Sequence, residues 1–112
     1  VVPACGVSTI CDTGIQPSIV VVVIDSLTGL PVADGAQGLV HDGAFTDTLV
    51  PYGYDDGMVL RSLAMRGERP GTYAVTVSRG GYQPWQRTSV HVAMAGCHTA
   101  QVTLTAPLQR LP

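Results

Sequence analysis

Apolar and polar side chains alternate most clearly along residues 70–82. Tyr73, Val75 and Val77 fall on one side of an extended backbone, whereas the residues between them are small or hydroxylated. A period of two is typical of a β-strand with one buried face. A Pro-Gly pair precedes the run and a Gly-Gly pair follows it, so turn-forming residues bound it at both ends. The pattern predicts a strand around which the rest of the domain is organised.

Other short segments carry similar patterns. Residues 19–24 are β-branched and apolar on both faces, which predicts a strand inside a sheet and not at its edge. The expected strands, with the one above, lie near residues 18–25, 37–41, 45–50, 58–65, 88–94 and 100–106, and residues 51–57 are expected to form a loop. Seven short strands without an amphipathic helix predict an all-β sandwich.

The chain has 112 residues, enough for one domain with a single core. Its longest apolar run has six residues, whereas a membrane-spanning helix needs about 20. The expected organisation is a lead-in at residues 1–17, a sandwich at residues 18–106 and a tail at residues 107–112. Residues 2–6 resemble the end of a bacterial lipoprotein signal, in which Cys5 would be acylated. The alternative is an ordinary cysteine in a tail. A lipid on Cys5 is the only membrane contact that we expect.

The charge pattern excludes several functions. The net charge is −2 and no basic cluster is present, so the chain has no positive face for nucleic acid. It contains neither lysine nor asparagine, which excludes Schiff-base chemistry, a P-loop and N-linked glycosylation. Three cysteines in a small β-domain favour an oxidising compartment. We therefore expect a secreted or periplasmic protein.

Several short motifs resemble those of one known family. They are residues 24–33 (Ile-Asp-Ser-Leu-Thr-Gly-Leu-Pro-Val-Ala), Asp56-Gly57, residues 70–77 (Pro-Gly-Thr-Tyr-Ala-Val-Thr-Val) and Gly81-Tyr82. In these motifs the chain resembles the carboxypeptidase regulatory-like domains of the prealbumin (transthyretin-like) fold. The resemblance covers about residues 18–106 and implies a seven-stranded Greek-key β-sandwich. It implies a scaffold and carries no activity with it.

The same resemblance bears on the cysteines. In prealbumin-like sandwiches the first and last strands lie side by side and run in the same direction. Cys11 precedes the first expected strand and Cys97 precedes the last, so the resemblance implies a Cys11–Cys97 disulfide. Cys5 would then be the unpaired cysteine, as a lipidated residue should be. The alternative pairing, Cys5–Cys11, would close only a small loop in the lead-in.

The prealbumin-like fold includes one enzyme branch, the hydroxyisourate hydrolases. Their histidine stands three residues before the aspartate that matches Asp25, where this chain has Val22. Their arginine before the Asp-Gly turn has no counterpart, since the first arginine here is Arg61. Their tail ends in Tyr-Arg-Gly-Ser, whereas this chain ends in Leu-Gln-Arg-Leu-Pro. We therefore expect no enzymatic activity and no catalytic residues.

The potential metal ligands do not form a recognisable set. His41, His91 and His98 are scattered, and no His-x-His or Cys-x-x-Cys spacing occurs. Asp55-Asp56-Gly57 lacks the spacing of a calcium loop and is better explained as a turn that an aspartate caps. We expect no metal and no other cofactor.

The remaining candidates for binding are aromatic residues. Tyr52, Tyr54 and Trp85 fall in expected loops, where aromatic rings can stack on sugars or hold a peptide. The alternative is that Trp85 covers one end of the core and the tyrosines cover the loop. The sequence thus favours a non-catalytic structural or interaction domain of a bacterial envelope protein or small lipoprotein. Its partner would be a protein or a glycan, and its oligomeric state is left open.

Overall fold

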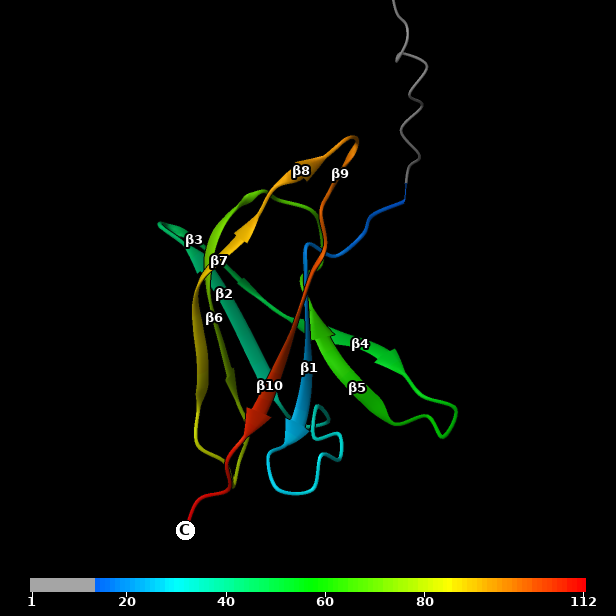
Figure 1. Ribbon diagram of the computed structural model, residues 1–112, viewed down its shortest axis with the longest axis vertical. Helices are drawn as coiled ribbons and strands as arrows, with labels where there is room; N and C mark the ends of the chain where they lie inside the picture. The colour runs from blue at the N-terminus through cyan, green and yellow to red at the C-terminus, as the bar shows by residue number, and fades with distance from the viewer. Residues whose placement is uncertain (1–13) are drawn as a thin grey trace, which may run out of the picture.

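The computed structural model describes residues 14–112, which form ten β-strands and no helix (Figure 1). The strands are β1 (Ile19–Asp25), β2 (Gln37–Asp42), β3 (Phe45–Thr48), β4 (Val50–Tyr54), β5 (Leu60–Ala64), β6 (Gly71–Ser78), β7 (Trp85–Val92), β8 (Met94–Ala95), β9 (His98–Thr99) and β10 (Val102–Leu108). Two four-stranded sheets have the orders β10-β1-β5-β4 and β3-β2-β6-β7. Strands β8 and β9 form a separate hairpin. The prediction of an all-β sandwich is confirmed at this level.

Strand β1 lies inside the first sheet, between β10 and β5, as its apolar composition predicts. It pairs with β10 in parallel, from Ile19 opposite Val102 to Asp25 opposite Leu108, and with β5 in the antiparallel direction. The first and last long strands therefore run side by side. Strand β10 continues two residues beyond Ala106, where the sequence pattern ends.

Strand β6 occupies the middle of the second sheet, between β2 and β7. Tyr73, Val75 and Val77 are buried, and the residues between them are partly exposed, so the predicted alternation is confirmed. The pairing of β6 with β7 shifts between Tyr73 and Val75. On β7 the extra residue is accommodated near Ser89, whose φ of 57° lies in the left-handed region.

Leu49 marks the point where the chain passes from one sheet to the other. Residues 45–50 were expected to form one strand and residues 51–57 a loop; both predictions are wrong. Strand β3 ends at Thr48 in the second sheet, and β4 begins at Val50 in the first. Leu49 is only 5% exposed, and its amide donates to the carbonyl of Gly38 at 2.8 Å. A Cβ at Gly38 would lie 2.6 Å from Leu49 Cδ1, so a glycine is needed for Leu49 to enter the core there.

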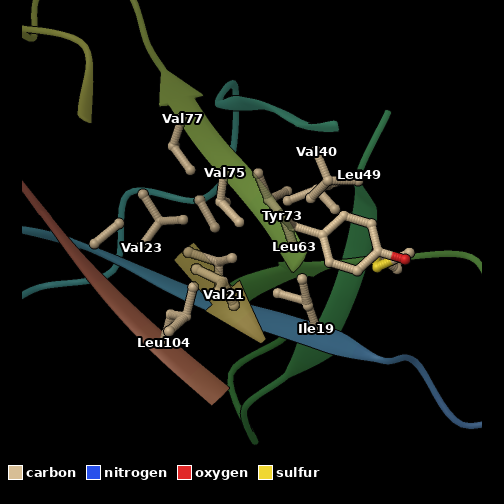
Figure 2. Close-up of a cluster of buried hydrophobic side chains, with 14 of the residues drawn as sticks. Ile19, Val21, Val23, Val40, Leu49, Leu63, Tyr73, Val75, Val77 and Leu104 are labelled. Carbon is tan, nitrogen blue, oxygen red and sulfur yellow. The ribbon is translucent and has the colours of Figure 1, made fainter. Parts of the chain in front are cut away.

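The facing surfaces of the two sheets enclose the core (Figure 2). Its largest fully buried side chain is Tyr73, whose hydroxyl donates to the carbonyl of Arg69 at 2.6 Å. The other labelled side chains in Figure 2 are aliphatic and come from both sheets: Ile19, Val21, Val23, Val40, Leu49, Leu63, Val75, Val77 and Leu104. Their burial is the main favourable contribution to the stability of the fold.

Each of the seven expected strands has a counterpart, and the three additional strands are β4, β8 and β9. The extra strands arise because Leu49 divides one expected strand and because the Gly96-Cys97 turn is flanked by a two-residue ladder. Within residues 14–112 there is no helix of the length and apolar character that crossing a membrane requires.

Candidate interaction surface on the β4–β5 hairpin

The hairpin of β4 and β5 extends away from the rest of the sandwich, at the right of Figure 1. Strand β5 is bound to β1 and buried on most of its length, whereas β4 is the edge strand of the sheet and is mostly exposed. Tyr52 lies opposite Ser62, whose hydroxyl donates to the Tyr52 carbonyl. The base of the hairpin is therefore attached to the sandwich through β5, and the edge strand β4 is exposed to solvent.

Asp55 builds the turn at the tip of the hairpin. Its Oδ1 accepts from the amides of Gly57 at 2.9 Å and Val59 at 3.0 Å, as the sequence predicts for an aspartate that caps a turn. Its Oδ2 accepts from Arg61 at 3.2 Å. Donation by the Val59 amide is the main reason that the pKa of Asp55 lies below its ordinary value, followed by Gly57 and Arg61.

This turn leaves apolar side chains in water. Tyr54 is 58% exposed and Met58 is 78% exposed, with Tyr52 and Val59 exposed beside them. Met58 has a φ of 62°, a conformation that glycine adopts more easily than methionine. Tyr54, Met58 and Val59 also line a shallow hollow of about 360 Å³ next to Pro51. We call these four side chains (Tyr52, Tyr54, Met58 and Val59) the hairpin surface.

The three aromatic residues singled out in the sequence divide into two groups. Tyr52 and Tyr54 both lie on β4, where they pair with Ser62 and Leu60 of β5. Trp85 begins β7, the edge strand of the second sheet, and packs partly against the core. The hollow of about 240 Å³ that Trp85 lines includes neither tyrosine among its described lining residues. The structure therefore places both tyrosines on the same edge strand and Trp85 in separate surroundings.

The histidines also lie in different settings. His41 on β2 and His91 on β7 are exposed, and the Nδ1 of His91 contacts the hydroxyl of Thr72 at 3.2 Å. His98 on β9 is half-buried, with Nδ1 2.7 Å from Glu68 Oε2. This contact lowers the pKa of Glu68, with further lowering by the amide of Thr99. Among residues 14–112, no three potential metal ligands gather into a site.

The sequence analysis missed the most deeply buried charge. The side chain of Asp25 is 2% exposed. Its Oδ1 accepts from the amides of Leu27 and Thr28, and its Oδ2 accepts from Tyr82 Oη at 2.8 Å and Arg110 Nε at 2.6 Å. The hydrogen bond from Arg110 is the largest cause of the strongly lowered pKa of Asp25. One signal was available, because Asp25 shares the parity of Ile19, Val21 and Val23 and must therefore face inward.

The cysteines are described only in part. Cys97 follows the φ-positive Gly96 in the β8–β9 turn and is disulfide-bonded. Cys5 and Cys11 lie outside the described residues, so the Cys11–Cys97 pairing and the acylation of Cys5 stay predictions.

The sequence was compared with protein families and with curated proteins. No protein-family model matches the chain, and no curated protein sequence matches it.

Proposed function

We propose that this domain is a non-catalytic, extracytoplasmic interaction domain of a bacterial envelope protein or small lipoprotein. Its scaffold would be a prealbumin-like sandwich of the carboxypeptidase regulatory-like kind, and its hairpin surface would contact a partner protein. The parallel pairing of β1 with β10 supports this scaffold, because the resemblance implies neighbouring first and last strands. The disulfide-bonded state of Cys97 supports an oxidising compartment.

The hairpin surface is the observation that carries the proposal. Exposed apolar side chains are common singly, but four of them on one projecting hairpin form a patch that a partner can cover. Tyrosine and methionine are enriched where proteins meet, because one offers a rigid ring with a polar end and the other adapts its shape. The backbone at Met58 is in the left-handed region, in the turn that its own amide closes by donating to the carbonyl of Asp55, and its side chain is left exposed to solvent.

The titratable groups support a non-catalytic role. A general acid or base works best with a pKa near the operating pH. The pKa values of Asp25, Asp55 and Glu68 are all lowered, so hydrogen bonds keep these carboxylates ionised. Each of the three carboxylates also accepts backbone amides, from residues two to four positions away at Asp25 and Asp55 and from the distant Gln16 and Thr99 at Glu68, so all three are engaged in holding the fold.

Site-specific photo-crosslinking in the native cells tests the proposal. A photoreactive residue at position 54 or 58 should give one and the same protein adduct. The matched control position is Thr105, an exposed residue of β10 on the other edge of that sheet. Adducts at neither hairpin position, or equal adducts at Thr105, would reject a partner at the hairpin. Recovery of the protein from the cytosol would reject the extracytoplasmic role.

A further inference from the structure

A second hollow is formed by residues that follow the hairpin in the sequence, and it lies between β7 and β10, which are edge strands of the two sheets. It has a volume of about 240 Å³ and is found where β7 begins and β10 ends, at the end of the molecule from which the C-terminus emerges (Figure 1). We call it the Trp85 cleft. Its lining residues are Gln83, Pro84, Trp85, Gln86, Pro107 and Gln109.

Backbone hydrogen bonds hold the two walls of the cleft together. The amide of Gln83 donates to the carbonyl of Gln109 at 2.7 Å, and the amide of Leu111 donates to the carbonyl of Gly81 at 3.0 Å. Between these contacts, Tyr82 and Arg110 form an isolated bridge. The loop before β7 and the segment after β10 are therefore joined, so the cleft is preformed.

Trp85 is held in place on the inner side of its strand. It lies opposite Val77, a core residue, and Arg87 lies opposite Val75. The guanidinium of Arg87 is 5.5 Å from the centre of the indole ring, within the range of a cation–π contact. The indole ring of Trp85 therefore packs partly against the core and is also in contact with the guanidinium of Arg87. Trp85 lines the cleft as well.

The polar side-chain groups of the cleft have no partners within residues 14–112. The side-chain amides of Gln83, Gln86 and Gln109 form no hydrogen bond with another of these residues, and neither does the indole N–H of Trp85. Each amide can donate and accept, whereas the indole can only donate. None of the described residues that line the cleft carries a carboxylate. Three glutamines and one aromatic residue therefore border a small hollow whose described lining has no acidic group.

We propose that the Trp85 cleft binds one ring of an uncharged saccharide. Sugar hydroxyls donate and accept hydrogen bonds, which matches amides, and the apolar C–H face of a sugar matches indole surface. The volume lies below the ~300–1,000 Å³ of pockets for drug-sized molecules, so one ring is the appropriate size. A proline-rich peptide fits less well, since such peptides dock on grooves with several aromatic residues and Trp85 is the one aromatic residue among the described lining residues.

This proposal rests on the non-catalytic role proposed above but not on the hairpin surface, so either site can fail without the other. Trp85 is the only tryptophan of the chain, and its fluorescence reports on the cleft directly. We would titrate the whole protein with glucose, galactose, N-acetylglucosamine and their β-1,4-linked disaccharides. A single shallow site gives millimolar affinity, so the titration should reach about 50 mM. At least one sugar should shift the emission with a saturable curve.

Variants separate binding from general quenching. Gln86→Ala and Gln109→Ala each remove one amide from the cleft and should weaken binding about three- to tenfold. Gln37→Ala removes an exposed glutamine from β2, outside the cleft, and should leave the affinity unchanged. Saturable binding that survives both cleft variants would overturn the proposal. So would the absence of any response to the sugars, or a response to a proline-rich peptide alone.

Discussion

Two aspartates in this domain perform the same local task in opposite surroundings. Asp25 is the last residue of β1 and Asp55 directly follows β4; each accepts two backbone amides with Oδ1 and contacts an arginine with Oδ2. Asp25 is 1% exposed and lies at a closed corner with Tyr82 and Arg110. Asp55 lies at the tip of a projecting hairpin, beside side chains in water.

The difference lies in the origin of their partners. The main cause of the lowered pKa of Asp55 is the amide of Val59, four residues away. The main cause for Asp25 is Arg110, 85 residues away, and the next is Tyr82. Asp25 therefore links β1 to Tyr82 and to Arg110 near the C-terminus, whereas Asp55 stabilises a single turn. The same residue type stabilises tertiary structure in one place and displays a surface in the other.

The largest expected effect is that of Asp25→Asn. An amide cannot accept at both ends, so in one orientation its NH₂ faces Tyr82 and Arg110, and in the other it faces the amides of Leu27 and Thr28. One pair of donors is left unsatisfied in either case. We expect the Tm to fall by more than about 10 °C in thermal unfolding followed by circular dichroism. A loss as small as that of Asp55→Asn would refute the comparison.

Acid should reveal the same difference. The native pKa of Asp25 lies below the value of about 3.9 expected in the unfolded chain, so the unfolded chain takes up the proton more readily. The stability that Asp25 contributes is therefore present above about pH 4 and is lost as the pH falls further. Tm measured from neutral to strongly acidic pH should decline more steeply for the wild type than for Asp25→Asn. Parallel curves would show that this carboxylate is not the group concerned.

Tyr82→Phe should have an intermediate effect. It removes only the hydroxyl that donates to Asp25 Oδ2 and keeps the ring beside Arg79, whose guanidinium is 5.5 Å from its centre. Arg110 still neutralises the carboxylate, so we expect a loss of about 1 kcal/mol in the free energy of unfolding by urea. A loss equal to that of Asp25→Asn would mean that the hydroxyl, and not the arginine, holds this corner together.

Asp55→Asn should have the smallest effect. Its Oδ1 can keep both backbone amides of the turn, and Arg61, which is exposed, can turn its guanidinium into solvent. We expect the Tm to change by less than about 3 °C. Differential scanning calorimetry of the two asparagine variants side by side provides the matched comparison. A large loss at Asp55 would show that the hairpin is part of the cooperative core.

The prediction of individual strands depended on how local their signals were. Two strands were identified from local patterns: β6 from the alternation of Tyr73, Val75 and Val77, and β1 from its apolar run. Such patterns are informative because a strand buried on one face has apolar residues at every second position, and a strand buried on both faces has them at every position. The division at Leu49 was not predictable in this way. In the sequence, Leu49 is equally compatible with a strand that continues beyond Thr48. Its side chain enters the core only because Gly38, which has no side chain, leaves space for it.

The candidate binding residues show the same limit. Aromatic type and expected loop position selected Tyr52, Tyr54 and Trp85. They could not reveal that Trp85 lies among glutamines from the start of β7 and from the segment after β10. Gln83, Gln86 and Gln109 carry no pattern of their own. Their convergence depends on the backbone pairing of the loop before β7 with the segment after β10.

The chain by itself determined an all-β class, the identity of its central strands and the cap at Asp55, because these depend on periodicity and on residues a few positions apart. Only the tertiary structure decided that Asp25 meets Tyr82 and Arg110, that Leu49 changes sheets and that the aromatic residues separate. Those features depend on contacts across tens of residues, and one unaligned sequence contains no measure of which distant residues meet. Burial then gives such contacts their energy, because a charge or donor removed from water must find its partner inside the protein.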